Sequence, residues 1–344
     1  MRLLIMIIIF CYATNIYGQN LVPNPGFENI KDTITNFTKD NFEFDAKVHN
    51  WISPTTATPD VITPDFIEKF IVPPPPHSGL NMIGMQSHKD DYIEYVMTDL
   101  LQPLLPNRTY YVEFWIRRSY CISPKMNVDQ KLNDSYGILF TSENKESSNS
   151  KILVGKPQIN PPSDLLITYK KWERVSKYFT PREKYDKLYL GQFQLKEGER
   201  LKMGYFVIDD IVVKEFKDYS SLDKDARLEV GTIIPLNNIF FKTGTTELKD
   251  SKSYDSLKEL SDYLNYNQSI RIQINGHTDA VGSNRSNMAL SKKRAKFIAQ
   301  SVIQNGIDKS RIEWKGFGEQ IPIADNESEE GKSKNRRVEF EVVK

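Results

Sequence analysis

One aspartate and one arginine in the C-terminal third of the chain carry the two charges that a zwitterionic ligand needs. Asp279 follows an alternating apolar segment, residues 270–274, and this alternation predicts a half-buried strand that ends at Asn275 and Gly276. Arg294 carries the complementary positive charge, because its planar guanidinium can bind a carboxylate through two parallel hydrogen bonds.

A helix must bring Arg294 to that strand end. From Asn287 onward apolar residues recur at helical spacing, and the pair Asn305-Gly306 is a typical helix stop. Arg294 therefore lies on this predicted helix, one turn beyond Leu290. A strand, a turn and a helix together position the acid and the base.

The motifs around this pair resemble the OmpA-like peptidoglycan-binding domain, and the resemblance spans residues 233–344. They are the GHTD turn at residues 276–279, the G-x4-N-x2-LS-x2-RA run at residues 282–295, and the closing NRRVEF at residues 335–340. One departure is Lys242, which stands where the family usually has an acidic residue. It affects the rim of the expected site and not its pocket.

The resemblance implies that the ligand is the peptide stem of peptidoglycan, whose diaminopimelate carries an ammonium and a carboxylate on one carbon. Asp279 would then accept from the ammonium, Arg294 would bind the carboxylate, and Asn287 would add amide contacts. The alternative is a structural Asp279–Arg294 ion pair without a ligand, and His277 is expected to stabilise the turn. The predicted peptidoglycan-binding residues are Asp279, Arg294, Asn287, Thr278, Gly282 and Leu290.

The start of the chain predicts export. Arg2 and the apolar run at residues 3–10 precede a small residue at Gly18, as in a cleaved signal peptide covering residues 1–18. The expected location is the periplasm, associated with the cell wall and outer membrane, and no transmembrane span is expected in the mature chain. Lipidation of Cys11 is the lesser alternative, because the bulky Phe10 precedes it. The formal net charge of +1 argues against nucleic acid as a partner.

Residues 19–216 have short strand-like runs and little helical periodicity, which predicts an all-β sandwich. A polar segment at residues 217–231 predicts a linker, and residues 232–344 are expected to form an α/β domain with a mixed sheet packed against helices. The prolines at residues 73–76 are expected in a loop. The predicted strands of the sandwich cover residues 92–97, 109–117, 136–141, 172–179, 188–193 and 205–215.

The sandwich also resembles a galactose-binding-like jelly roll, of the kind used as carbohydrate-binding modules in exported bacterial proteins. The matching residues are 20–28, Trp51 and 205–211. The resemblance implies a structural calcium ion held by Glu28 with Asp209 or Asp210. A buried carboxylate in the otherwise apolar last strand would need such a partner. In the alternative, the two aspartates end an edge strand and face water.

Trp115 shares a strand face with charged residues and is a candidate stacking platform for a sugar, unless a loop or the second domain covers it. The sequence contains no G-x-S-x-G, H-E-x-x-H or P-loop motif, so a non-enzymatic role without a cofactor for activity is expected. The expected role is anchoring of the sandwich, which would hold a glycan or protein of the envelope, to the cell wall. The alternatives are a structural part of an envelope secretion or motility complex, or an accessory to a glycan-processing enzyme.

Overall fold

The computed structural model describes residues 19–32, 34–67, 71–88, 92–106, 108–121, 130–132, 134–145, 153–195, 204–216, 228–236, 239–242 and 244–344. The predicted signal peptide with Cys11, and residues 217–227 of the predicted linker, lie outside these ranges. In the described part of the chain no helix is long and apolar enough to cross a membrane.

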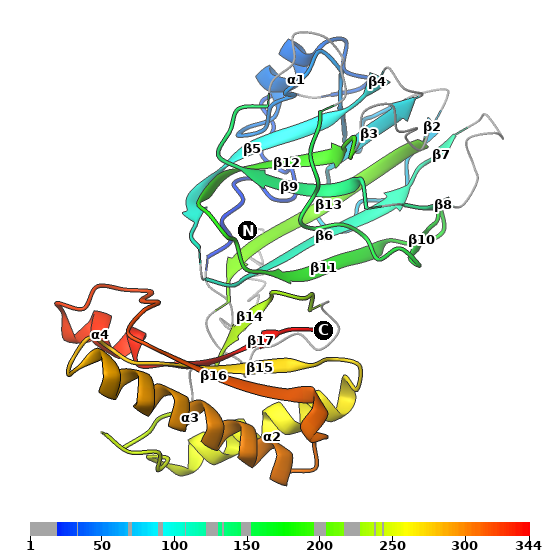
Figure 1. The fold of residues 1–344 in the computed structure, drawn as a ribbon. Coiled ribbons are helices and arrows are strands. Elements are labelled where there is room, and N and C mark those ends of the chain that lie inside the picture. The colour runs from blue at the N-terminus through cyan, green and yellow to red at the C-terminus, as the bar shows by residue number, and fades with distance from the viewer. Residues whose placement is uncertain are drawn as a thin grey trace, which may run out of the picture.

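The N-terminal part is built almost entirely of antiparallel strands (Figure 1). One sheet has the order β1-β3-β13-β6-β11, with β4 added to β3, and a second has the order β5-β12-β9. The elements are α1 (Asn41–Lys47), β1 (Asp60–Ile62), β2 (Ile71–Val72), β3 (Met82–His88), β4 (Tyr92–Ile93), β5 (Tyr95–Leu104), β6 (Tyr110–Arg118), β7 (Tyr120–Cys121), β8 (Gln130–Lys131), β9 (Tyr136–Thr141), β10 (Leu166–Ile167), β11 (Glu173–Phe179), β12 (Tyr185–Gln192) and β13 (Gly204–Glu215).

A single apolar core joins the two sheets. Phe114 of β6, Phe140 of β9 and Leu190 of β12 belong to the same cluster of buried side chains, so the sheets pack face to face. The alternation along β6 follows the prediction, since Phe114 is buried while its neighbours Glu113 and Trp115 are partly exposed. The predicted all-β sandwich is therefore confirmed. Its assignment as a galactose-binding-like jelly roll stays a prediction.

The six predicted strands are all present, with shifted ends. The segment expected at residues 92–97 is split into β4 and β5, and β5 continues to Leu104. The prolines at residues 73–76 lie in a loop, as expected. Trp51 is fully buried and its ring lies 5.1 Å from that of Phe27.

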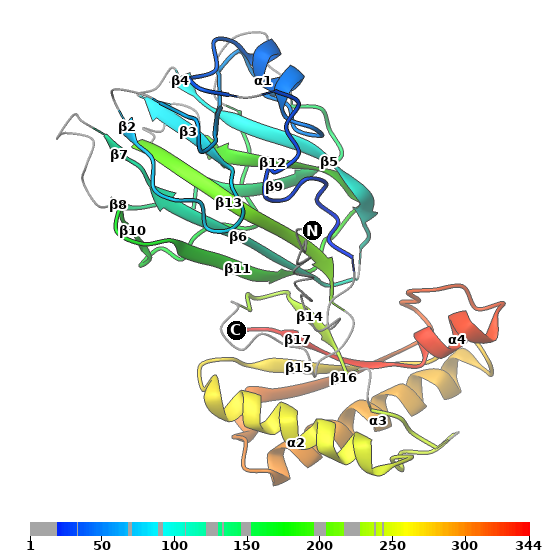
Figure 2. The same cartoon turned by 180° about the vertical axis from the view of Figure 1, so that it is seen from behind.

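The C-terminal part is a four-stranded mixed sheet with helices on one face (Figures 1 and 2). The strand order is β14-β17-β15-β16, where β15 is parallel to β16 and antiparallel to β17. This mixed sheet packed against helices was predicted. Its elements are β14 (Ile233–Pro235), α2 (Ser251–Tyr266), β15 (Ile272–His277), α3 (Asn284–Gln304), the 3-10 helix η4 (Lys309–Arg311), β16 (Ile312–Gly318), α4 (Glu329–Asn335) and β17 (Val338–Val342).

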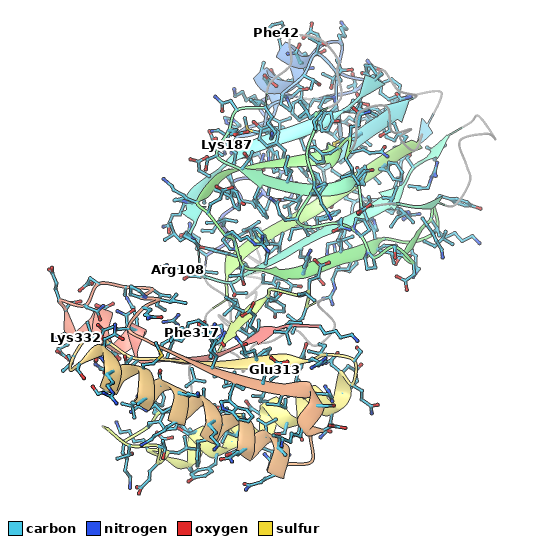
Figure 3. All side chains as sticks on the ribbon, viewed as in Figure 1. Phe42, Arg108, Lys187, Glu313, Phe317 and Lys332 are labelled. Atoms are coloured by element: carbon cyan, nitrogen blue, oxygen red, sulfur yellow. The ribbon has the colours of Figure 1, made fainter. Side chains whose placement is uncertain are left out.

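The two parts touch through a shared apolar cluster. Tyr111, Tyr178 and Phe216 of the sandwich belong to the same buried cluster as the core of the C-terminal sheet. The Phe216 ring meets Tyr178 edge-on, with a centroid distance of 4.9 Å. Figure 3 shows Phe42 at the end of the molecule opposite Lys332 of α4. Phe216 of this contact directly precedes the predicted linker at residues 217–231, and the domain limits themselves stay predictions.

Candidate functional site

Two glycines let helix α3 lie directly on the strands that carry the site. A Cβ atom on Gly276 of β15 would lie 2.3 Å from the carbonyl oxygen of Ser291, and one on Gly316 of β16 would lie 2.4 Å from the backbone nitrogen of Lys292. Both distances are far below a van der Waals contact. The close approach places the first turns of α3 beside the end of β15.

The turn between β15 and α3 is fixed by local hydrogen bonds. Gly282 has a φ of +105°, a conformation that strains other residues. Ser283 caps α3, because its side chain accepts a hydrogen bond from the backbone N–H of Ser286. The sequence predicted this helix from Asn287 onward, and the structure begins it slightly earlier, at Asn284, and ends it at Gln304, next to the predicted stop.

Asp279 lies in this turn with its carboxylate largely buried. Its Oδ1 accepts a hydrogen bond from the backbone N–H of Val281 at 3.1 Å. Its Oδ2 forms an ion pair with a guanidinium nitrogen of Arg336 at 2.7 Å. Among the described residues, the ion-pair partner of Asp279 is therefore Arg336, and the alternative of a direct structural pair with Arg294 does not describe this structure.

Arg294 is held by the loop that follows β14. Its Nε donates to the carbonyl oxygen of Thr245 at 3.1 Å, and one of its terminal nitrogens donates to that of Lys242 at 3.4 Å. The guanidinium also lies over the ring of Phe241, 4.9 Å from its centroid. Burial lowers the pKa of Arg294, while the negative charge of Asp279 acts in the opposite direction. Since arginine is effectively always protonated in proteins, this side chain keeps its charge.

Lys242, the departure noted in the sequence, contributes to the site only through its backbone. Its exposed side chain pairs with Glu247 of the same loop, with 2.8 Å between Nζ and the carboxylate. Its carbonyl oxygen accepts the hydrogen bond from Arg294, so this contact uses no atom of the lysine side chain.

The remaining predicted residues surround the two charges. Asn287 is buried, and its amide donates to the carbonyl oxygen of Asp279 at 3.3 Å and to Glu319 at 2.5 Å. Thr278 is buried, and its hydroxyl oxygen has no hydrogen-bond partner in the described part of the chain. Leu290 is partly exposed and Gly282 is exposed. The structure thus gathers these residues at one end of β15 and α3.

Arg336 is the site residue that the sequence analysis did not assign to ligand binding. It stands at the end of α4, and its position depends on Asn335, whose fully buried amide bonds to the loop before α4. The NRRVEF motif contained the signal, because a charged residue directly beside a buried asparagine is held in a fixed place. Only the folded chain shows that this place is next to Asp279.

His277 takes a structural position, in agreement with the expectation. It is buried, its Nε2 lies 3.1 Å from a carboxylate oxygen of Glu339, and its ring stacks on Phe317. Burial lowers the pKa of His277, and the neighbouring Glu339 works against that shift.

The three acids predicted to hold calcium in the sandwich do approach one another. A Cβ on Gly26 would lie 3.5 Å from Asp210 Oδ1, 3.7 Å from Asp209 Oδ1 and 3.8 Å from Cγ of Glu28. Strand β13 runs between β3 and β6, so the alternative of an edge strand is wrong.

Protein groups already bond these carboxylates. Asp209 Oδ2 accepts from the backbone N–H groups of His77 and Ser78, and Asp210 contacts both of their side chains. Glu28 accepts from two backbone N–H groups of the same loop. Within the described ranges, no group of three or more His, Cys, Asp and Glu side chains is arranged to hold a metal ion. The calcium ion stays a prediction.

The ring of Trp115 is stacked against the imidazole of His77. The two rings are stacked with a centroid distance of 3.7 Å, and Trp172 meets His77 edge-on. Trp172 also donates to the carbonyl oxygen of Pro75 in the proline loop. One face of Trp115 is therefore occupied by the loop, which corresponds to the covered alternative considered from the sequence.

Comparisons with known proteins find relatives of the C-terminal part of the chain. The OmpA family matches residues 240–336. Outer membrane porin F of Pseudomonas fluorescens is 39% identical over 90 residues, which cover 26% of this chain and 28% of that protein. The peptidoglycan-binding protein ArfA of Mycobacterium bovis is 40% identical over 89 residues, covering 26% of this chain and 27% of that protein.

A solved structure, the peptidoglycan-associated lipoprotein from Burkholderia pseudomallei, is 25% identical, with a TM-score of 0.29; the match covers 30% of this chain and 87% of that one. For the two curated relatives, porin F and ArfA, the match spans less than a third of each protein's length. The names of the two curated relatives describe a porin and a peptidoglycan-binding protein, and neither describes an enzyme. A role that needs no catalytic cofactor agrees with these matches. Residues 240–336 accordingly resemble a domain of the OmpA family.

Proposed function

We propose that the C-terminal domain binds peptidoglycan and thereby anchors the β-sandwich to the cell wall in the periplasm of an exported protein. The observation that carries this proposal is the juxtaposition of one carboxylate, Asp279, with two guanidinium groups, Arg336 and Arg294, at the end of β15. A free amino acid head presents an ammonium and a carboxylate on one carbon, so it needs both signs of charge within a few ångströms.

Asp279 keeps room for a ligand although it is already paired. Each carboxylate oxygen has two lone-pair directions, and the structure uses one direction at Oδ1 for Val281 and one at Oδ2 for Arg336. An ammonium can therefore bind Asp279 without displacing Arg336. The ligand's carboxylate would then bind Arg294, whose guanidinium is oriented in advance by Thr245 and Phe241.

Thr278 supplies a further group of the right kind. Its hydroxyl is buried and has no partner among the described residues, and a buried polar group without a partner costs free energy. A polar ligand in the turn would satisfy it. The relative ArfA is itself named a peptidoglycan-binding protein, which supports the same ligand class here.

The test is co-sedimentation with purified sacculi. Asp279→Ala and Arg294→Ala should each remove the folded protein from sacculi, because losing one partner of a desolvated charge pair costs about 2 to 5 kcal/mol. Lys293→Ala is the matched control, since Lys293 is the exposed neighbour of Arg294 on the same helix. Retention of both site variants on sacculi would reject the assignment.

The ligand head can be tested with soluble stem peptides. Stems with diaminopimelate should bind more tightly than stems with lysine, because lysine lacks the side-chain carboxylate that we assign to Arg294. Equal affinities of the wild-type protein for both stems would show that Arg294 does not bind this carboxylate. They would not contradict binding to the cell wall itself.

A further inference from the structure

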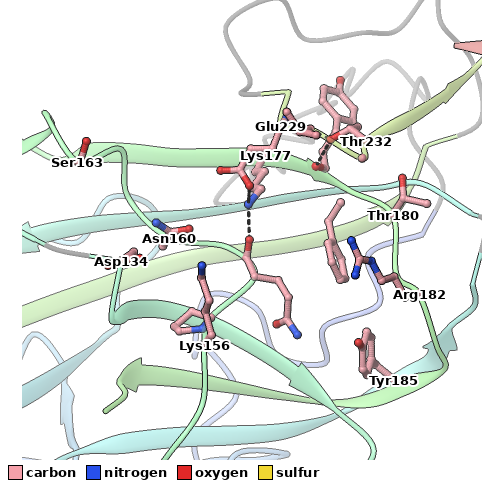
Figure 4. A pocket seen from close by; sticks show the side chains of 16 residues that line it. Asp134, Lys156, Asn160, Ser163, Lys177, Thr180, Arg182, Tyr185, Glu229 and Thr232 are labelled. Atoms are coloured by element: carbon pink, nitrogen blue, oxygen red, sulfur yellow. Dashed lines mark hydrogen bonds and ion pairs between the residues drawn. The ribbon is translucent and has the colours of Figure 1, made fainter. Parts of the chain in front are cut away.

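A cavity lies away from the proposed wall-binding site, where the sandwich meets the start of the C-terminal domain (Figure 4). It has a volume of about 840 Å³, which is within the range of pockets that hold small ligands. Residues of β11 and of the segment at residues 156–163 form one side, and residues 229–232, just before β14, form another. Both parts of the chain therefore contribute to it.

The floor of this cavity is fixed by internal contacts. The buried ammonium of Lys177 donates to the carbonyl oxygen of Gln158 and pairs with the carboxylate of Glu229. The side-chain amide of Gln158 bonds to both backbone groups of Phe140, at 2.8 and 3.1 Å. These groups have their partners, so they give the cavity a stable shape and are not its ligand-binding groups.

An aromatic stack provides one wall. The rings of Phe179 and Tyr185 are nearly parallel, with an angle of 21° and a centroid distance of 6.2 Å. Phe179 is itself stacked on the buried Phe140 at 5.5 Å. Tyr185 at the end of this stack is partly exposed. A rigid, half-exposed ring of this kind is a suitable surface for the C–H face of a sugar.

Two cations at the opening are available to a ligand. Lys156 and Arg182 are exposed, and the described residues provide no ion-pair partner for either. Figure 4 shows Arg182 beside Tyr185, with Lys156 across the cavity from it. Charges on separate sides suit acidic groups spaced along a chain, whereas a single phosphate needs donors that converge on one point. Asn160 and Ser163 add neutral groups that can hydrogen-bond hydroxyls.

We propose that this cavity is a binding site for an acidic saccharide, with Tyr185 as the stacking surface and Arg182 and Lys156 as the partners of its carboxylates. The site is independent of the wall-binding residues, which lie at the far end of β15. It also requires the C-terminal domain to be docked on the sandwich, because residues 229–232 complete the cavity.

The experiment is isothermal titration calorimetry of the purified protein with an oligogalacturonate, compared with a neutral galactose oligomer of equal length. The uronate should bind at least ten times more tightly. Arg182→Ala and Lys156→Ala should each weaken uronate binding about tenfold or more, and Tyr185→Ala should weaken it as well. Lys184→Ala is the matched control, because Lys184 is exposed in the same segment but does not line the cavity.

Asp279→Ala serves as a second control, since it should abolish sacculus binding and leave uronate binding unchanged. Failure of one activity is therefore distinguishable from failure of the other. The proposal is overturned if the oligogalacturonate produces no binding heat, if the neutral oligomer binds equally well, or if the Arg182 and Tyr185 variants bind the uronate like the wild type.

Discussion

At the level of single residues, the most consequential contact is the ion pair between Asp279 and Arg336, 2.7 Å long, with the arginine 41% exposed and the aspartate 12% exposed. It gives Arg336 two roles in the proposed site. The side chain holds the carboxylate of Asp279 in place, and it adds a second positive charge where the ligand's carboxylate would lie. An arginine does both because its several N–H groups point in different directions.

Arg336→Ala is therefore expected to weaken binding to sacculi by about 1.5 to 3 kcal/mol, the range for a hydrogen bond to a charged group. The measurement is a binding isotherm with sacculi, together with a melting curve to verify folding. Lys334→Ala is the control, since Lys334 is an exposed cation on α4 that pairs with Glu330. Unchanged affinity of the Arg336 variant would mean that Asp279 is positioned without it.

Asp209 gives a second prediction at this scale. Burial raises the pKa of Asp209 to about 7, and the nearby Asp210 adds to the shift. The folded protein thus binds a proton between pH 4 and 7 that the unfolded chain releases, so stability from this group is present at low pH and decreases as the pH rises toward 7. Each pKa unit corresponds to about 1.4 kcal/mol.

Asp209→Asn should flatten the fall in melting temperature between pH 4 and 7. If calcium binds Glu28 with Asp209 or Asp210, calcium at pH 7.5 should raise the wild-type melting temperature, chelator should reverse the rise, and the Asn variant should respond to neither. If neither calcium nor chelator changes the melting temperature of the wild-type protein, the predicted calcium site does not exist. If the melting temperature of the variant falls with pH as steeply as that of the wild type, Asp209 is not the group responsible for the fall.

At the level of elements, the site depends on how closely α3 approaches β15 and β16. Gly276 and Gly316 make this approach possible, because the atoms that a methyl group would meet belong to the helix backbone and cannot rotate away. The helix carries Asn287 and Arg294, and the strand leads into Asp279. The spacing between the two elements therefore sets the spacing between the charges.

Gly276→Ala is expected to destabilise the protein by about 1 to 3 kcal/mol, as overpacking does, and to weaken sacculus binding in the molecules that remain folded. Thermal melting and sacculus co-sedimentation measure the two effects. Gly306→Ala is a control for glycine loss alone, because nothing lies within 4 Å of a Cβ atom there, although its φ of +96° adds backbone strain. Equal binding by the Gly276 variant and the wild type would show that the helix adjusts.

For the whole molecule, the contact between the two parts decides how firmly the C-terminal domain and the sandwich are held together. Tyr178 of β11 packs into the cluster that contains the C-terminal core, and its carbonyl oxygen accepts a hydrogen bond from Thr232. The backbone N–H of Ile233 donates to Thr180 at 3.0 Å. Such a shared apolar cluster couples the unfolding of two domains.

The intact protein should accordingly unfold in a single calorimetric transition. Phe216→Ala removes a buried ring that meets Tyr178 edge-on and should cost about 3 to 5 kcal/mol. We expect this loss to split the transition into two, while Phe42→Ala, which removes an exposed ring, leaves one. Two transitions in the wild type would show that the contact does not couple the domains.

The sequence by itself determined most of the elements and named most of the residues of the proposed binding site. Alternation with a period of two placed the strands of the sandwich, and helical spacing with an Asn-Gly stop placed α3, because these patterns record which side chains are buried. The GHTD motif marked Asp279 and the G-x4-N-x2-LS-x2-RA run marked Arg294, since both motifs lie in one continuous strand–turn–helix segment. Their proposed ligand rests on that same resemblance.

Only the tertiary structure decided which charges meet. Asp279 pairs with Arg336, which lies on a different element, and the carbonyl groups that orient Arg294 come from the loop after β14. Asp209 lies in a central strand and is bonded to the loop at His77, and the same loop covers Trp115. Contacts between segments far apart in the chain depend on how whole elements pack, and no local pattern of residue types records that packing.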